Sequence, residues 1–352
     1  MDTTSVPSVD RAFSPLDAVL KLTDRQWSES VSELAVWVGG QVSFELASEI
    51  LERVGGIKLS AASIWREVQE WGQALVELEE IESQRANATP GREEIIPGTP
   101  VSQQRKGVAI DGWLVNIREE GWKEVKLGAV FDVKLREGTD PITQETVECG
   151  QAVNCTYTTH LGGPERFGEG LWAEALRRDV HAAYDKVCLG DGAAWIWNLC
   201  LDYFPEAEQI VDWYHAKDHL CTAIQLAYGH QPEQAKRQLK SYETALYLGQ
   251  ASAIASWLDE KANSQPEVAD DLRKQAAYFR NNHRRMHYLD YREDLWPIGS
   301  GVVESGCKQF QMRLKGPGMH WSRPGAERML ALHASIRSHR FDSRWSQLQS
   351  RQ

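Results

Sequence analysis

Three carboxylates in the sequence stand where metal-dependent chemistry could use them. Asp111 ends the apolar run 108–110, Asp191 lies between Gly190 and Gly192 after a short apolar stretch, and Glu304 lies in a later segment of helical spacing. Oxygen ligands suit Mg²⁺, and two cations held by carboxylates can catalyse displacement at a phosphodiester. We therefore predict that Asp111, Asp191 and Glu304 are catalytic residues that bind two Mg²⁺ ions, for which Mn²⁺ can substitute.

Each of these acids also has a simpler interpretation. An Asp that precedes Gly at the end of a strand is commonly a turn residue. Glu304 and Lys308 form an i,i+4 pair of the kind that stabilises helices. The catalytic interpretation depends on finding all three acids in the order of elements described below.

The charge of the chain is uneven. The 352 residues carry a net charge of −11, which by itself argues against a nucleic-acid ligand. Residues 1–105 have 9 Lys and Arg against 17 Asp and Glu, a net of −8, whereas residues 301–352 have 9 against 3, a net of +6. Within this cationic segment we expect phosphate contacts from the residues that follow Glu304, although they could simply form a solvated helix face: Lys308, Arg313, Lys315 and Arg323.

The sequence does not predict a membrane or secreted protein. It contains no apolar run of the roughly 18 residues that a membrane helix needs, and its first residues lack the features of a signal peptide. The six cysteines have no C-x-x-C spacing, as is typical of reduced thiols. We expect a cytoplasmic, nucleoid-associated protein with no membrane partner.

Residues 1–82 are expected to form a helical, helix-turn-helix-like DNA-binding domain. Apolar residues recur at helical spacing in segments 43–54 and 60–71, which are separated by two glycines and by Ser60, a residue suited to cap the second helix. In such a motif the second helix enters the major groove, where Ser63, Arg66 and Gln69 would contact DNA. The alternative is a small helical bundle without a DNA-binding role.

A linker rich in Pro and Gly is expected at 83–105, followed by a catalytic domain at 106–345. Alternating apolar residues predict a hairpin of strands at 108–117 and 122–133, then a strand at 154–161. A helix at 168–184, a strand at 186–189, a helix at 193–201 and a strand at 209–213 follow. This β-β-β-α-β-α-β order predicts an α/β RNase H-like fold, with an all-helical insertion at 216–298. In that fold the first and fourth strands are neighbours, so Asp111 and Asp191 would face each other and Glu304 would close the site.

Several stretches of the sequence match motifs of a known family. The chain resembles DDE transposases of bacterial insertion sequences, close to the ISKra type. The matching stretches are Val108-Ala109-Ile110-Asp111-Gly112, Trp122-Lys123-Glu124-Val125-Lys126-Leu127-Gly128, Leu189-Gly190-Asp191-Gly192, Ile298-Gly299-Ser300-Gly301-Val302-Val303-Glu304, Arg313-Leu314-Lys315-Gly316 and Gly318-Met319-His320-Trp321. The match covers about 106–340 well and the N-terminal region more loosely, through Phe13-Ser14-Pro15-Leu16-Asp17.

The resemblance implies a transposase that cleaves transposon ends and transfers the 3′-hydroxyl to target DNA. Asp111, Asp191 and Glu304 would be the DDE triad. Asp212 and His215, in a D-x-x-H pattern, would lie near the site, since related transposases with a helical insertion carry this pattern, and 112 positions separate Asp191 from Glu304. We also expect Trp321 either to stack on an unpaired base or to pack in the core.

One departure from the family bears on end recognition. Related chains carry a short cysteine pair upstream of the position of Phe13, and this sequence has none there, as a shortened or diverged copy would. The alternatives to a transposase are therefore a transposase-derived DNA-binding or regulatory protein without activity, and an RNase H-like nuclease that does not join strands. Because two ends must be handled, we expect a homodimer or larger assembly on DNA.

Overall fold

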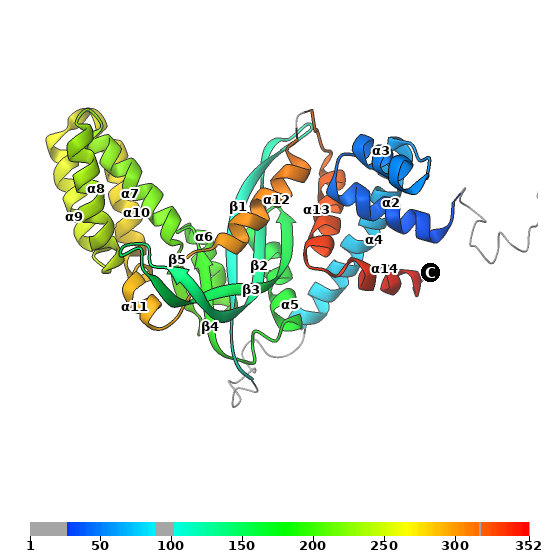
Figure 1. The fold of residues 1–352 in the computed structure, drawn as a ribbon, viewed down its shortest axis with the longest axis horizontal. Helices are drawn as coiled ribbons and strands as arrows, with labels where there is room; N and C mark the ends of the chain where they lie inside the picture. Colours follow the sequence, from blue (N-terminus) through cyan, green and yellow to red (C-terminus); the bar gives the residue numbers. More distant parts are fainter. Residues whose placement is uncertain (1–26, 89–101, 317, 352) are drawn as a thin grey trace, which may run out of the picture.

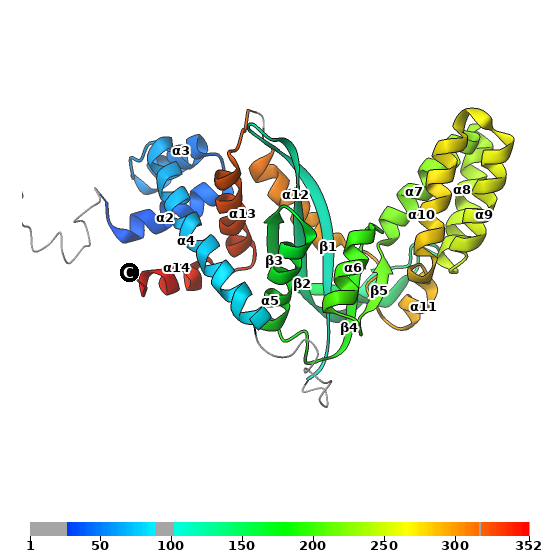
Figure 2. The ribbon, with the colours of Figure 1, turned by 180° about the vertical axis from the view of Figure 1, so that it is seen from behind.

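The computed structural model describes residues 27–88, 102–316 and 318–351. A central sheet lies between two helical parts, which occupy opposite ends of the elongated molecule (Figure 1, Figure 2). The stretch Phe13-Ser14-Pro15-Leu16-Asp17 and the proline- and glycine-rich part of the expected linker lie outside the described residues.

The sheet has five strands in the order β3-β2-β1-β4-β5. Strands β1 (Ser102–Ile117), β2 (Gly121–Thr139) and β3 (Thr146–Leu161) form an antiparallel meander, whereas β4 (Ala183–Gly190) and β5 (Glu208–Val211) run parallel to β1. Residues 125–131 of β2 are all buried, as expected of a strand that is covered on both faces. The fold is therefore a mixed α/β structure with added helices.

Helices cover both faces of this sheet. Successive side chains of a strand point to opposite faces, and the neighbouring positions 127 and 128 of β2 meet different helices. Leu127 lies against Gly306 of α12 (Gly301–Leu314), while Gly128 lies against Phe167 and Leu171 of α5 (Pro164–Arg177). Helix α6 (Ala194–Tyr203) connects β4 to β5.

The N-terminal helices are α2 (Glu29–Gln41), α3 (Phe44–Gly55) and α4 (Ala61–Ala88). The expected break between α3 and α4 is confirmed: Gly56 ends α3 with a positive φ of 66°, and the Ser60 hydroxyl accepts a hydrogen bond from the Ser63 amide at 3.1 Å. The second helix was expected to end near residue 71, but α4 continues to Ala88, into the expected linker.

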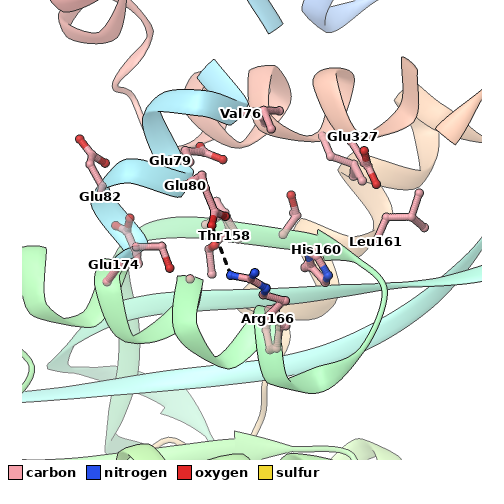
Figure 3. A pocket seen from close by; sticks show the side chains of 18 of the residues that line it. Val76, Glu79, Glu80, Glu82, Thr158, His160, Leu161, Arg166, Glu174 and Glu327 are labelled. Atoms are coloured by element: carbon pink, nitrogen blue, oxygen red, sulfur yellow. Dashed lines mark hydrogen bonds and ion pairs between the residues drawn. The ribbon is translucent and has the colours of Figure 1, made fainter. Parts of the chain in front are cut away.

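Helix α4 is joined to the rest of the molecule by packing and by ion pairs. Gly72 allows it to approach α13 (Arg323–Arg337) closely, because a Cβ atom at Gly72 would lie 3.0 Å from the Arg328 carbonyl oxygen. A pocket of about 260 Å³ is lined by residues of α4, α5, β3 and α13 (Figure 3). In this pocket Arg166 of α5 forms an ion pair with Glu80 of α4 at 3.2 Å. These contacts fix α4 against the sheet layer. The division at 83–105 into separate domains stays a prediction.

Between β5 and α12 the chain is helical, as expected for 216–298. Helices α7 (Trp213–Tyr228), α8 (Pro232–Tyr247), α9 (Ala251–Ser264) and α10 (Ala269–Asn282) form a bundle that projects from one end of the molecule (Figure 1). The short α11 (Tyr288–Glu293) leads back toward the sheet, and α14 (Phe341–Gln349) follows α13 near the N-terminal helices.

Several element boundaries differ from those expected. The helix predicted to reach residue 184 ends at Arg177, because Asp179 adopts a positive φ of 54° and β4 already begins at Ala183. Strands β2 and β3 extend beyond the apolar segments that predicted them, to Thr139 and back to Thr146. Within the described ranges, no helix has the length and apolar character that a membrane span requires.

Candidate active site

Three aspartates lie where the parallel pairing of the sheet ends: Asp191 and Asp212 directly follow β4 and β5, and Asp111 lies within β1, one residue past its last pair with β4. Ile110 of β1 pairs in register with Gly190 of β4, and Gly190 pairs with Val211 of β5. The residues that follow these three partners are Asp111, Asp191 and Asp212. The carboxyl end of parallel strands is the usual position of ligand chemistry in open sheets, and the register places the three carboxylates on adjacent strands.

Asp111 is held by two donors. Its Oδ1 atom accepts a hydrogen bond from the Gly112 amide at 2.7 Å, and the Cys307 thiol donates a second. Burial raises the pKa of Asp111, the two hydrogen bonds oppose that rise, and the negative charge of Asp191 adds to it. Asp111 and Asp191 therefore lie close enough to repel each other.

The turn that carries Asp191 is fixed by α10 of the helical bundle. The Asp191 side chain accepts a hydrogen bond from the Ala193 amide at 2.8 Å. The Tyr278 hydroxyl donates to the Asp191 carbonyl oxygen at 2.9 Å, and the Asn282 side chain donates to the Gly192 carbonyl oxygen at 3.2 Å. The bundle is thus part of the structure that positions the Asp191 carboxylate.

Asp212 and His215 form a pair beside the two aspartates. Asp212 caps α7 through the His215 amide at 2.9 Å and accepts a hydrogen bond from the Ser300 hydroxyl at 2.7 Å. Burial alone would raise the pKa of Asp212, but the hydrogen bonds from His215 and Ser300 outweigh it, so the pKa lies below its usual value.

The imidazole of His215 lies 3.4 Å from Asp212 through its Nδ1 atom. The hydrogen bond to Asp212 raises the pKa of His215 to about 9, against the effect of burial, and the charges of Asp212, Asp111 and Asp191 add to the rise. His215 is accordingly the positive charge within this group of carboxylates.

Glu304 is on α12 beside this group but is bound to another residue. Its Oε1 atom accepts a hydrogen bond from Lys308 Nζ at 2.6 Å, while Cys307, one turn along α12, donates to Asp111. Within residues 27–88, 102–316 and 318–351, no three His, Cys, Asp or Glu side chains are grouped so that they could hold a metal ion. The structure thus brings Asp111, Asp191, Asp212 and His215 together and leaves Glu304 paired with Lys308.

The predicted DNA contacts of α4 have different surroundings. Arg66 is exposed, and its Nε atom donates to the Ala62 carbonyl oxygen. Gln69 is buried, and its Oε1 atom accepts a hydrogen bond from Arg328 of α13 at 3.3 Å. Because α13 packs over this part of α4, Gln69 is not available to a base in this conformation.

The residues after Glu304 are also largely engaged within the protein. Arg313 is buried and donates to the Gly39 carbonyl oxygen at 2.8 Å, and Trp321 is buried with its Nε1 donating to the Leu314 carbonyl oxygen at 2.9 Å. Arg323 pairs with Glu120 at 2.6 Å. Lys315 is exposed and lies over the Trp122 ring, 5.6 Å from its centroid. Of the two expectations for Trp321, the structure fits packing in the core. Among the residues that the structure describes, Lys315 is the exposed cation of this set with no carboxylate within ion-pair distance.

Sequence reasoning did not find four residues that support the site. Ser300, Cys307, Tyr278 and Asn282 contact the three aspartates or their turns. Cys307 could have been noticed, since it lies three positions after Glu304 and hence on the same side of a helix. Tyr278 and Asn282 carry no local signal, because their role depends on how the bundle packs.

No family model matches the chain. The chain is similar to the "UPF0236 protein in vanSb 3′region" of Streptococcus gallolyticus, with 24% identity over 344 residues, which span 95% of this chain and 69% of that protein. The similarity therefore extends over both the N-terminal helices and the sheet that carries the aspartates.

Proposed function

We propose that this protein is a DNA transposase that cleaves phosphodiester bonds at transposon ends and transfers the 3′-hydroxyl to target DNA. The observation that carries the proposal is the register of β1 and β4, which places Asp111 and Asp191 on adjacent strands, each one residue past the last pair between β1 and β4. Burial is the main cause of the raised pKa of Asp111, and the negative charge of the nearby Asp191 adds to it.

The sheet supports the same proposal. Its strand order β3-β2-β1-β4-β5, with β2 antiparallel to β1, is the arrangement expected of an RNase H-like fold. The helical bundle lies between β5 and α12, as expected of a DDE transposase with an insertion before its third acidic residue. The proposal combines this topology with the sequence motifs that surround the acids.

Two residues at the site could contribute ligands to a divalent cation. Asp111 and Asp191 offer oxygen ligands of the kind that Mg²⁺ and Mn²⁺ prefer, and a cation between them would relieve their repulsion. Glu304 would complete the ligand set once it is released from Lys308. Bound there, two such ions would activate a water molecule or 3′-hydroxyl and stabilise the leaving oxygen.

The protein's own residues prepare the site for a phosphodiester. The Cys307 thiol and the Gly112 amide orient the Asp111 carboxylate, and Tyr278 holds the turn of Asp191. Asp212 fixes the imidazole of His215, which can donate a hydrogen bond to a phosphate oxygen that lies between the aspartates. The positive charge of His215 would also offset the charge of an incoming DNA strand.

A second candidate is a transposase-derived DNA-binding or regulatory protein without activity. The Glu304–Lys308 ion pair favours this candidate, because Lys308 occupies the carboxylate that would otherwise be the third metal ligand. A nuclease that cuts without joining differs from the main proposal only in its products. Joined DNA strands distinguish a transposase from both.

The replacement Asp191→Asn tests the proposal. We expect it to reduce Mg²⁺-dependent nicking of DNA that carries the gene's own flanks by at least about a hundredfold, because a charged ligand is lost, while DNA binding is retained. Gel analysis of end-labelled DNA measures nicking, and the exposed Asp202→Asn is the control of equal charge. Undiminished metal-dependent nicking in Asp191→Asn would rule out the assigned site.

A further inference from the structure

A groove of about 930 Å³ follows the outer edge of the sheet. Its floor is formed by 154–157 of β3, the edge strand, and its walls by α2, α12 and the end of α13. Within the described parts of the chain, no Asp or Glu side chain lines this groove. In a protein whose net charge is −11, a groove without carboxylates is a surface that an anion could approach.

Three arginines line this groove, and they differ in their partners. Arg178 pairs with Asp132 at 2.9 Å and Arg340 pairs with Glu174 at 2.6 Å, but neither carboxylate lines the groove. Arg337 donates through Nε to His333 at 3.3 Å. Among the described residues it has no acidic partner within ion-pair distance, so its charge is the one that a ligand would neutralise.

A flat apolar surface lies beside this charge. Trp37 of α2 lines the groove and is 42% exposed, which is unusual for the largest apolar side chain. The amides of Gln41 and Gln309 line the walls near it, and each can both donate and accept hydrogen bonds. An exposed aromatic ring beside an unpaired arginine is the combination that binds single-stranded nucleic acid, in which bases stack and phosphates pair.

We propose that this groove binds an unpaired segment of nucleic acid, with a base stacked on Trp37 and a phosphate bound by Arg337. The inference rests on the proposed function in that the strand would be a single-stranded region of the DNA being processed. Arg337 would also provide the phosphate contact that the buried Arg313 and the paired Arg323 do not offer in this structure.

The test measures binding of a fluorescein-labelled 20-nucleotide oligothymidine to the full chain by fluorescence anisotropy. EDTA is present, so that cleavage cannot contribute. We expect Trp37→Ala to weaken binding about tenfold through the loss of one stacked base, and Trp37→Phe to restore most of it. We expect Arg337→Gln to lower the salt dependence of binding by about 0.7 in the slope of log K against log[salt], as for one phosphate on a single strand.

Matched controls separate the groove from general effects. Tyr184→Ala removes another exposed aromatic ring, at the start of β4, and Arg273→Gln removes an exposed arginine on α10. Both controls should bind the oligonucleotide as the unaltered chain does, and equal thermal midpoints should show that all variants are folded. If Trp37→Ala and Arg337→Gln bind normally, or if the controls lose affinity equally, the groove is not the binding site.

Two further comparisons identify the ligand and separate this inference from the proposed function. A 20-base-pair duplex should bind more weakly than the oligothymidine and should be insensitive to Trp37→Ala; tighter duplex binding that depends on Trp37 would contradict an unpaired ligand. The Asp191→Asn variant should bind the oligothymidine normally. Retained cleavage by Asp191→Asn would reject the proposed site while leaving the result for the groove intact.

Discussion

At the scale of single residues, the site is a balance of charges. Asp111 and Asp191 repel each other, and His215, held by Asp212, is the nearest positive charge among them. Lys308 neutralises Glu304 in the same way on α12. A divalent cation that binds the aspartates would compete with these internal partners, so its affinity should respond when one of them is removed.

The Lys308–Glu304 pair gives a test of that competition. We expect Lys308→Gln to strengthen Mn²⁺ binding about twofold to fivefold, because a solvent-exposed ion pair contributes up to about 1 kcal/mol and its loss frees Glu304. Electron paramagnetic resonance of free Mn²⁺ during a titration measures this affinity. Lys274→Gln, which removes a similar exposed pair with Asp271, serves as the control. Unchanged or weaker Mn²⁺ binding in Lys308→Gln would show that Glu304 does not become a metal ligand when its ion pair is removed.

Among the elements, helix α10 contacts the turn that carries Asp191. Its Tyr278 stacks on His219 of α7, with ring centroids 3.6 Å apart, and donates its hydroxyl to the Asp191 carbonyl oxygen. Asn282 of the same helix joins Trp197 to the Gly192 turn. The bundle therefore supports the carboxyl end of β4 from the side.

We expect Tyr278→Phe to reduce Mg²⁺-dependent nicking about threefold to tenfold, since one hydrogen bond contributes about 0.5–1.5 kcal/mol. Because the variant acts through the Asp191 turn, the Mg²⁺ concentration for half-maximal nicking should rise while the KM for DNA stays constant. Tyr242→Phe, on α8 of the same bundle, should leave both values unchanged. A higher KM for DNA with normal Mg²⁺ dependence would instead place Tyr278 in DNA binding.

Helix α13 contributes a buried histidine to the packing of the N-terminal helices. His333 is fully buried, contacts the Phe310 ring and hydrogen-bonds to the Gly40 carbonyl oxygen at 2.9 Å. Burial lowers the pKa of His333 to about 4, and the charges of Arg337 and Arg313 add to this shift. Between pH 6.5 and 4 the unfolded chain therefore binds a proton at this residue that the folded chain does not.

The stability contributed by neutral His333 is present above pH 6.5 and is lost as the pH falls toward 4. We expect the free energy of unfolding to fall with pH in this window more steeply than in His333→Gln, by about 1.4 kcal/mol per pH unit. Urea unfolding at several pH values measures both slopes, and the difference between them removes the contributions of other groups. Equal slopes would mean that His333 is not held neutral in the folded protein.

The elements were partly predictable from the sequence. Apolar alternation and the glycines near 55 and 190 gave the β1–β2 hairpin, the α3–α4 break and the short β4, because these patterns depend on local spacing. The end of α5 at Arg177 was missed, because apolar residues at helical spacing continue past Asp179, whose positive φ ends the helix. The neighbouring positions of Asp111 and Asp191 followed from strand order, whereas the burial of Gln69, Arg313 and Trp321 depends on α13 and could not be read from charge or residue type.

At the scale of the whole molecule, the described residues form one group of aspartates, on the sheet that lies between two helical ends (Figure 1). Under the proposed function one such site would act on one DNA end at a time, so we expect a homodimer or larger assembly on DNA. The groove beside Trp37 lies among the N-terminal helices and the sheet edge, while the bundle supports the site from the other end. Both helical parts would then take part in one reaction.

The most direct measurement of the central claim is a strand-transfer assay. Purified protein is incubated with labelled DNA that carries the gene's own flanks and with an unlabelled target plasmid, in Mg²⁺ or Mn²⁺, beside Glu304→Gln. We predict labelled flank DNA joined to the target through its 3′ end, dependent on the metal and lost in Glu304→Gln. Bound but uncut DNA, or cut DNA without joined product under conditions in which the protein binds the flanks, would contradict a transposase.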